Sequence, residues 1–222
     1  RTCCPASAAA VRPRRMDPPP TLVNLSDDAV RSIVAAGLSD VYCPSSLADL
    51  TSTCSSLRTA LGPQLSALRQ LHSAARAVCV KLGLTLNGLR AARDLTGTRL
   101  TDADCATLHV LSCKHGALAS AETLDLNDMM IGDPGVASLA SAFAAGAMPG
   151  LQQLDLSYNL WISDSSCKSL AAASETGGLA SLVHLKLWRN QIGDAGLRAL
   201  AAALADGAMP RLRSLYLDHN PA

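Results

Sequence analysis

Short segments of the chain switch from an alternating to a helical pattern of apolar residues. In LVHLKL, residues 182–187, apolar and polar positions alternate with one slip, as in a half-buried strand. The residues that follow place Ile192, Leu197, Leu200 and Leu204 on one face of a helix. The pattern predicts a strand, a turn and a helix in direct succession.

The same switch recurs at a nearly constant interval. The second leucine of the L-x-L segment is Leu126, Leu156, Leu187 or Leu217, and a weaker copy places Leu95 there. The intervals are therefore 31, 30, 31 and 30 residues. A constant period of this length is typical of a solenoid, in which stacked copies bury one another's leucines.

The repeated pattern LxLxxN followed by IxDxGxxxL resembles the leucine-rich repeat family, most closely its ribonuclease-inhibitor-type subclass, over residues 89–222. The resemblance implies an α/β solenoid with parallel strands on a concave face and helices on a convex face. It also implies that an asparagine three residues after the second leucine bonds to the backbone inside the turn. These asparagines are Asn159, Asn190 and Asn220, while Met129 and Thr98 take the same slot in the first two copies.

The predicted helices carry start and stop signals. Asp133, Asp164 and Asp194 stand where a carboxylate would cap the first free amides of its own helix. Gly146 and Gly207 stand where a helix ends in a left-handed residue. The repeats therefore predict structural roles for these aspartates and glycines.

A second pattern precedes the repeats, in residues 25–61. It predicts three short helices, which could form a cap over the first repeat. The opening LSDDAVRSIVAAGL and the close LADLTSTCSSLRTAL also resemble the F-box family, although Ser26 replaces its usual proline. That resemblance implies contact with a Skp-type adaptor of a ubiquitin ligase through Leu25, Ile33, Leu50 and Leu57.

These patterns predict four parts. Residues 1–20 form a tail without ordered structure, in which Met16 could be the true start. Residues 21–62 form the small all-α F-box-like module, and residues 63–88 form a linker helix that begins at Pro63. Residues 89–222 form the repeats, which end where the pattern requires another turn and helix, so the sequence is expected to be a fragment.

Composition narrows the classes of function. The net charge of +1 gives no basic footprint for nucleic acid or an anionic membrane, and no apolar run is long enough to span a bilayer. Without a signal-peptide pattern we expect a cytoplasmic or nuclear protein. Of the eight cysteines, Cys105, Cys113 and Cys167 fall at apparent core positions, so we expect no metal site. We also expect no cofactor and no catalytic residue.

The strand positions between the leucines are expected to form columns on the concave face. One column is Asp125, Asp155, Lys186 and Tyr216. Tryptophan, tyrosine and arginine are the residue types enriched in interface hot spots. We therefore predict a partner-binding patch with Trp188 at its centre, comprising Trp188, Arg189, Tyr158, Tyr216, Lys186, Asp155 and His219, whereas Trp161 is expected to pack at a turn.

Three functions fit these expectations. The first is a substrate-recognition subunit of a Skp-cullin-F-box type ubiquitin ligase, which binds its target through the concave face. The second is a non-enzymatic leucine-rich-repeat scaffold with a helical N-terminal cap. The third is a regulator of a small GTPase, a role known for some proteins with this type of repeat. Alternatively, the concave residues cover the sheet without any partner.

Overall fold

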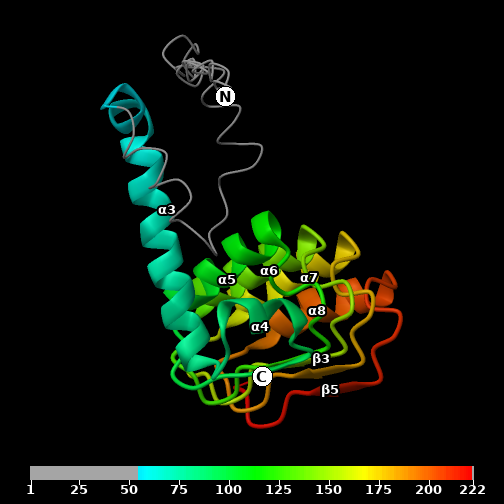
Figure 1. Ribbon diagram of the computed structural model, residues 1–222. Helices are drawn as coiled ribbons and strands as arrows, with labels where there is room; N and C mark the ends of the chain where they lie inside the picture. Colours follow the sequence, from blue (N-terminus) through cyan, green and yellow to red (C-terminus); the bar gives the residue numbers. More distant parts are fainter. Residues whose placement is uncertain (1–54, 222) are drawn as a thin grey trace, which may run out of the picture.

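The computed structural model describes residues 55–221, with residues 55–62, 64 and 65 as backbone only (Figure 1). Helices and strands alternate along the described chain after a long first helix. In chain order the elements are α3 (Ser55–Lys81), α4 (Leu86–Ala91), β1 (Asp94–Thr96), α5 (Asp102–His115), β2 (Thr123–Asp125), α6 (Asp133–Ala144), β3 (Gln153–Asp155), α7 (Asp164–Glu175), β4 (His184–Lys186), α8 (Asp194–Ala205) and β5 (Ser214–Tyr216).

The strands form one parallel sheet in the order β1 to β5, and helices α5 to α8 lie in a row against it (Figure 1). The first leucines of successive copies are in register and form a buried row, which is partly exposed only at its last member: Leu95, Leu124, Leu154, Leu185 and Leu215. Stacking removes these apolar side chains from water, which one copy could not do alone. The arrangement is the expected α/β solenoid.

The first copy is shifted from its expected alignment. The sequence pattern places Leu95 at the second leucine, but Leu95 pairs with Leu124, which is a first leucine. Gly97 therefore stands in the second-leucine position of that copy. The spacing does not reveal this shift, because Leu95 still lies 31 residues before Leu126. The turn after Gly97 is shorter than the later turns, which compensates for the shift.

The asparagine ladder is confirmed. The Oδ1 atom of Asn159 accepts hydrogen bonds from the amides of Met129 (3.1 Å) and Ile131 (3.4 Å) in the preceding coil. Its Nδ2 atom donates to the carbonyl oxygens of Leu126 (2.9 Å) and Leu156 (3.0 Å). Asn190 and Asn220 repeat the pattern one coil at a time. Each asparagine therefore joins two coils by satisfying buried backbone groups.

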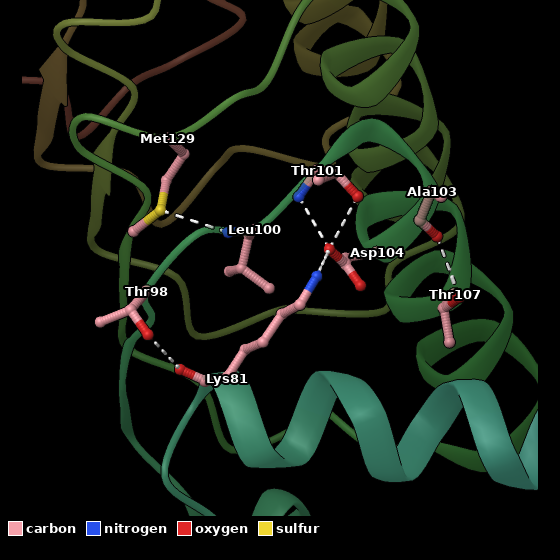
Figure 2. A network of polar contacts seen from close by, with 8 residues as sticks. All are labelled: Lys81, Thr98, Leu100, Thr101, Ala103, Asp104, Thr107 and Met129. Atoms are coloured by element: carbon pink, nitrogen blue, oxygen red, sulfur yellow. Dashed lines mark hydrogen bonds and ion pairs between the residues drawn. The ribbon is translucent and has the colours of Figure 1, made fainter.

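The prediction that Thr98 takes this slot in the first copy is wrong. The amide that donates into the ladder there belongs to Leu100, which donates to the sulfur of Met129 at 3.4 Å (Figure 2). The Thr98 hydroxyl instead donates to the carbonyl oxygen of Lys81 at 3.4 Å. The shift of Leu95 explains the error, since the slot lies three residues beyond Gly97.

The aspartates at the helix starts cap a different helix from the one expected. The N-cap residues of α6, α7 and α8 are Gly132, Ser163 and Gly193, so each aspartate is the first residue inside its helix. The carboxylate of Asp133 reaches the next coil and accepts from the Ser163 amide at 2.9 Å and the Ser166 amide at 3.2 Å. Capping therefore occurs between coils.

The same bridge recurs on both sides of Asp133. The Asp102 carboxylate accepts from the amides of Gly132 (2.8 Å) and Gly135 (3.1 Å), and Asp164 accepts from the Gly193 amide at 2.7 Å. The Asp194 carboxylate is exposed and pairs with Arg198 in its own helix at 3.5 Å. The aspartates thus form a second ladder, on the helix side of the coils.

The helix stop signals act as the sequence predicts. Gly146 follows α6 with φ +71°, and Gly207 follows α8 with φ +77°. The Gly146 amide donates to the Phe143 carbonyl at 2.8 Å, and the Ala147 amide donates to the Ala142 carbonyl at 3.0 Å. Two such bonds around a left-handed glycine satisfy carbonyl groups that the helix end leaves free.

Helix α3 differs from the linker helix expected at residues 63–88. The helix does not begin at Pro63 but passes through it, and it ends at Lys81. Gly83, with φ +66°, supplies the stop, and the Leu84 amide closes the turn on the Cys79 carbonyl at 2.9 Å. The short helix α4 then starts from Thr85, whose hydroxyl accepts from the Gly88 amide at 2.9 Å.

A polar network fastens α3 to the first coil (Figure 2). The Lys81 ammonium lies 2.5 Å from Oδ2 of Asp104, a mostly buried carboxylate that also accepts from the amide and the hydroxyl of Thr101, each at 2.8 Å. Burial alone would raise the pKa of Asp104, but these hydrogen bonds and the lysine charge lower it below its ordinary value. Thus α3 covers the open end of the stack at α5.

Two core assignments need correction. Cys105 and Cys167 are fully buried as expected, but Cys113 is exposed, and Ser112 takes the position that Phe143 has in the next coil. The alignment of Cys113 with Phe143 in the repeat pattern is therefore one residue out of phase. Trp161 does not pack at its turn either, since 72% of its surface is exposed.

Two N-terminal predictions remain, the tail of residues 1–20 and the F-box-like module of residues 21–62. The whole tail, and the module as far as Cys54, lie outside the described residues. Among residues 55–221, no helix is both long and apolar enough to cross a membrane.

Candidate functional site

The exposed side of the sheet, which points away from α5 to α8, carries the predicted patch. We call this side the sheet face. Its central column is in register as expected, since Asp125 pairs with Asp155, Asp155 with Lys186, and Lys186 with Tyr216. Because side chains alternate along a strand, these residues project opposite to the buried leucines.

Asp155 and Lys186 neutralise each other within that column. The Lys186 ammonium lies 3.1 Å from Oδ2 of Asp155, and only 8% of the Asp155 side chain is exposed. The other oxygen, Oδ1, accepts from the Ser157 amide at 3.0 Å. Both carboxylate oxygens of Asp155 therefore have partners within the protein, one of which is the Lys186 ammonium.

Tyr158, Trp188 and Arg189 form a compact aromatic and cationic cluster. The two rings meet edge to face, with centroids 4.5 Å apart and planes inclined by 70°. The Arg189 guanidinium carbon lies 5.2 Å from the Tyr158 centroid and 6.0 Å from the Trp188 centroid. Both distances are within reach of a cation–π interaction, which holds the arginine in place. The three predicted residues are therefore brought together.

The backbone aims part of this cluster. Tyr158 and Arg189 have φ values of +58° and +54°, in the left-handed region that residues with a side chain rarely adopt. Arg99, Asp128 and His219 share this conformation at the equivalent place in their coils. The conformation therefore belongs to the repeat, in which it recurs at the turn that follows each strand.

Tyr216 and His219 extend the patch onto the last described coil. The Tyr216 side chain is 43% exposed and stands beside Lys186 in the column. His219 lines a shallow hollow of about 270 Å³, together with Tyr158, Leu160, Arg189, Asn190 and Gln191. A hollow of this size fits one or two side chains rather than a drug-sized ligand.

Ser157 is a feature of the site that the sequence pattern did not single out. Its side chain is fully buried, and its hydroxyl has no hydrogen-bond partner among the described residues. Continuing the register of β3 and β4 by two residues places it beside Trp188. A buried polar group without a partner is unusual and costs free energy. A serine in a sheet-face column gave no signal of this burial in the sequence.

Large apolar side chains also lie exposed at the turns that follow the strands. The exposed fractions are 69% for Met130, 63% for Leu160 and 72% for Trp161. Backbone bridges link the segments that carry them, since Gly132 pairs with Trp161. Leu160 also lines the hollow beside Tyr158. The apolar surface therefore continues from the sheet face onto these turns. The sequence pattern does not predict this continuation, because it places Trp161 packed at its turn.

The buried thiols favour a structural role. Burial, with the nearby charges of Asp102 and Asp104, raises the pKa of Cys105 to about 12. Burial, with the charges of Asp164 and Asp133, does the same for Cys167. Such thiols are poor nucleophiles at neutral pH. Among the described residues, no group of three or more His, Cys, Asp or Glu side chains could hold a metal ion.

The side chains expected to contact an adaptor are not among those that the structure describes. Leu25, Ile33 and Leu50 lie outside the described residues, and Leu57 lies in α3, where only the backbone is described.

Residues 178–201 match a family model described as Leucine Rich repeat. The matched segment runs from the turn after α7 through β4 into α8, and it contains Trp188 and Arg189. Together with the parallel strands and stacked helices, the match supports a leucine-rich repeat protein, and such repeats suggest a role in protein interaction. No curated protein matches the chain.

Proposed function

We propose that this protein is a non-enzymatic binding protein whose sheet face, centred on Trp188, holds a segment of a partner protein. The observation that carries the proposal is the cluster of Tyr158, Trp188 and Arg189, three residue types enriched in interface hot spots, on an open surface. The exposed leucine, methionine and tryptophan at the adjoining edge add apolar area for the same contact.

The test is a selection of random peptides displayed on phage against the full chain. Trp188→Ala should weaken binding of the selected peptides by about 2 kcal/mol, roughly 30-fold, if Trp188 is a hot spot. The measurement is Kd by fluorescence anisotropy, with thermal unfolding as a check that the variant keeps its fold. Peptides that bind the variant and the wild type equally would contradict a site at Trp188.

The more specific function that we propose is substrate recognition in a Skp-cullin-F-box type ubiquitin ligase. Its support is the F-box resemblance of residues 25–61, which would present Leu25, Ile33, Leu50 and Leu57 to the adaptor. The sheet face would then hold the substrate. The chain should co-elute with a co-expressed Skp-type adaptor in size-exclusion chromatography, and the double substitution Ile33→Asp and Leu50→Asp should abolish co-elution while circular dichroism stays unchanged.

The second candidate is a protein-binding scaffold in which the N-terminal helices only cap the solenoid. The contact of Lys81 with Asp104 favours it, because the C-terminal end of α3 is committed to the first coil. Failure of the folded wild-type chain to co-elute with the adaptor would leave this candidate. The same result would remove the ligase function, while the peptide-binding test of the sheet face would stand independently.

A further inference from the structure

We infer that the segment held by the sheet face carries a carboxylate side chain next to a bulky apolar side chain. Arg189 pairs with the carboxylate, and the apolar side chain lies in the hollow between Tyr158 and Leu160. This inference rests on the proposed function and names the chemistry of the partner.

Arg189 is a cation that its own fold leaves available. Among the described residues the ion pairs are Lys81–Asp104, Arg93–Glu122, Lys186–Asp155 and Arg198–Asp194, and Arg189 takes part in none of them. Asp218, in the neighbouring coil, is exposed and likewise makes no ion pair with Arg189. The guanidinium therefore keeps its charge and its donors for a ligand.

The aromatic rings prepare Arg189 for that ligand. A guanidinium held near two rings loses less freedom on binding than a flexible lysine would, and its planar fork matches both oxygens of a carboxylate. The neighbouring Lys186 offers no such site, because Asp155 already neutralises it at 3.1 Å. The charge pattern of the patch therefore selects an acidic group at Arg189.

The hollow beside Arg189 selects the second group. Its wall contains the Tyr158 ring and the largely exposed Leu160, both of which offer apolar surface. Asn190 also lines the hollow, but its side-chain nitrogen already donates to the carbonyl oxygens of Leu156 and Leu187 at 3.0 Å each. A volume of about 270 Å³ suits a leucine, methionine or phenylalanine side chain. Acidic and apolar groups only a few residues apart on one segment would reach both places.

The experiment uses the peptides selected on phage against the full chain. Those that depend on Trp188 should be enriched in Asp or Glu within three residues of a bulky apolar residue. For one such peptide, changing its acidic residue to the amide should weaken binding to the wild type by about tenfold, as expected for a charge-assisted pair. Arg189→Gln should bind the acidic and amide forms within about twofold of each other.

Arg198→Gln is the matched control, since it removes the same charge from the exposed surface of α8. It should discriminate between the two peptides as the wild type does. Arg189→Lys, which keeps the charge without the planar fork, should discriminate less than the wild type, and it serves as the test variant if Arg189→Gln fails to fold.

The experiment distinguishes failure of this inference from failure of the proposed function. Peptides that require Trp188 but show no acidic enrichment, or equal discrimination by wild type and Arg189→Gln, would overturn the inference and leave the proposed function intact. Peptides that bind Trp188→Ala as tightly as the wild type would overturn the proposed function and the inference with it.

Discussion

At the residue scale, Asp133 links two coils through four hydrogen bonds to two serines. Its carboxylate accepts from the amides of Ser163 and Ser166 and from both of their hydroxyls, at 2.5–3.2 Å. Burial alone would raise the pKa of Asp133, but these bonds outweigh it and lower the pKa below its ordinary value. The ionised form is therefore the one that the native state prefers.

A folded-state pKa below the unfolded value means that ionised Asp133 stabilises the fold above the ordinary aspartate pKa, about 3.9. This contribution is lost as the pH falls through the lower folded pKa. We therefore expect Asp133→Asn to reduce the pH dependence of the unfolding free energy between about pH 5 and 2. Urea titrations across this range measure it, and an unchanged slope would contradict the assignment. Asp194→Asn, at an exposed carboxylate, is the control.

Asn159 provides a second prediction at this scale. Its amide satisfies buried groups on both sides, whereas the equivalent Asn220 is half-buried. Losing the bonds of a buried group costs about 1–3 kcal/mol per unsatisfied partner. Asn159→Ala should therefore lower the unfolding free energy by about 3 kcal/mol or more, and Asn220→Ala by clearly less, because water can replace its bonds. Equal losses in urea titration would show that the ladder does not depend on burial.

The sequence pattern identified these residues but not all of their partners. The asparagines were placed correctly because a fixed offset from a leucine defines them. The pattern predicts that each aspartate caps its own helix, because a sequence does not show which coil a carboxylate faces. Ser157 and Trp161 were missed for a related reason, because their burial depends on neighbouring coils rather than on local spacing.

At the scale of elements, the turn after α7 can approach α6 closely because Gly178 in that turn has no side chain. A Cβ atom on Gly178 would lie 2.3 Å from the carbonyl oxygen of Phe143 and 2.8 Å from the amide nitrogen of Ala144. These are backbone atoms at the end of α6, so they can move only if the helix moves. The coils can stack this closely only with glycine at residue 178.

We therefore expect Gly178→Ala to lower the unfolding free energy by about 1–3 kcal/mol, the usual cost of overpacking. Gly150→Ala is a matched control, because its new Cβ would lie 3.7 Å from the nearest neighbour, the Ala121 carbonyl oxygen. That variant should be neutral or slightly stabilising, since alanine restricts the unfolded chain more than glycine does. Thermal unfolding of both variants checks the difference, and a neutral Gly178→Ala would contradict the close packing.

The order of the elements followed from hydrophobic spacing, but the element boundaries did not. The change from a period of two to a period of 3.6 marks each strand and helix, so the strands and helices of the solenoid were predictable. The pattern predicts a helix start at Pro63, although α3 runs through it. The pattern places Leu95 at the second-leucine position, whereas its pairing with Leu124 puts it at the first. The same interval can arise from a shifted start combined with a shorter turn.

At the scale of the whole molecule, buried thiols in different helices can report how the stack opens. Cys105 lies in α5 and Cys167 in α7, both fully buried, whereas Cys113 is exposed at the end of α5. Cys79 is buried near the end of α3, which packs on α5 from outside the row, and burial raises its pKa. In a solenoid each repeat contacts only its neighbours, so an end element opens more easily than an internal one.

Alkylation of the native chain at pH 8 should follow this order. The pKa of about 12 for Cys105 and Cys167 leaves a thiolate fraction on the order of a thousandfold below that of an ordinary cysteine. Cys113 should therefore react first, Cys79 next, and Cys105 and Cys167 only after opening of the stack. Mass spectrometry of the labelled peptides distinguishes the four thiols, and unfolded chain in urea sets the intrinsic rates. Labelling of Cys167 as fast as Cys113 would mean that α7 is not held between α6 and α8, and the packing on which the sheet face depends would have to be revised.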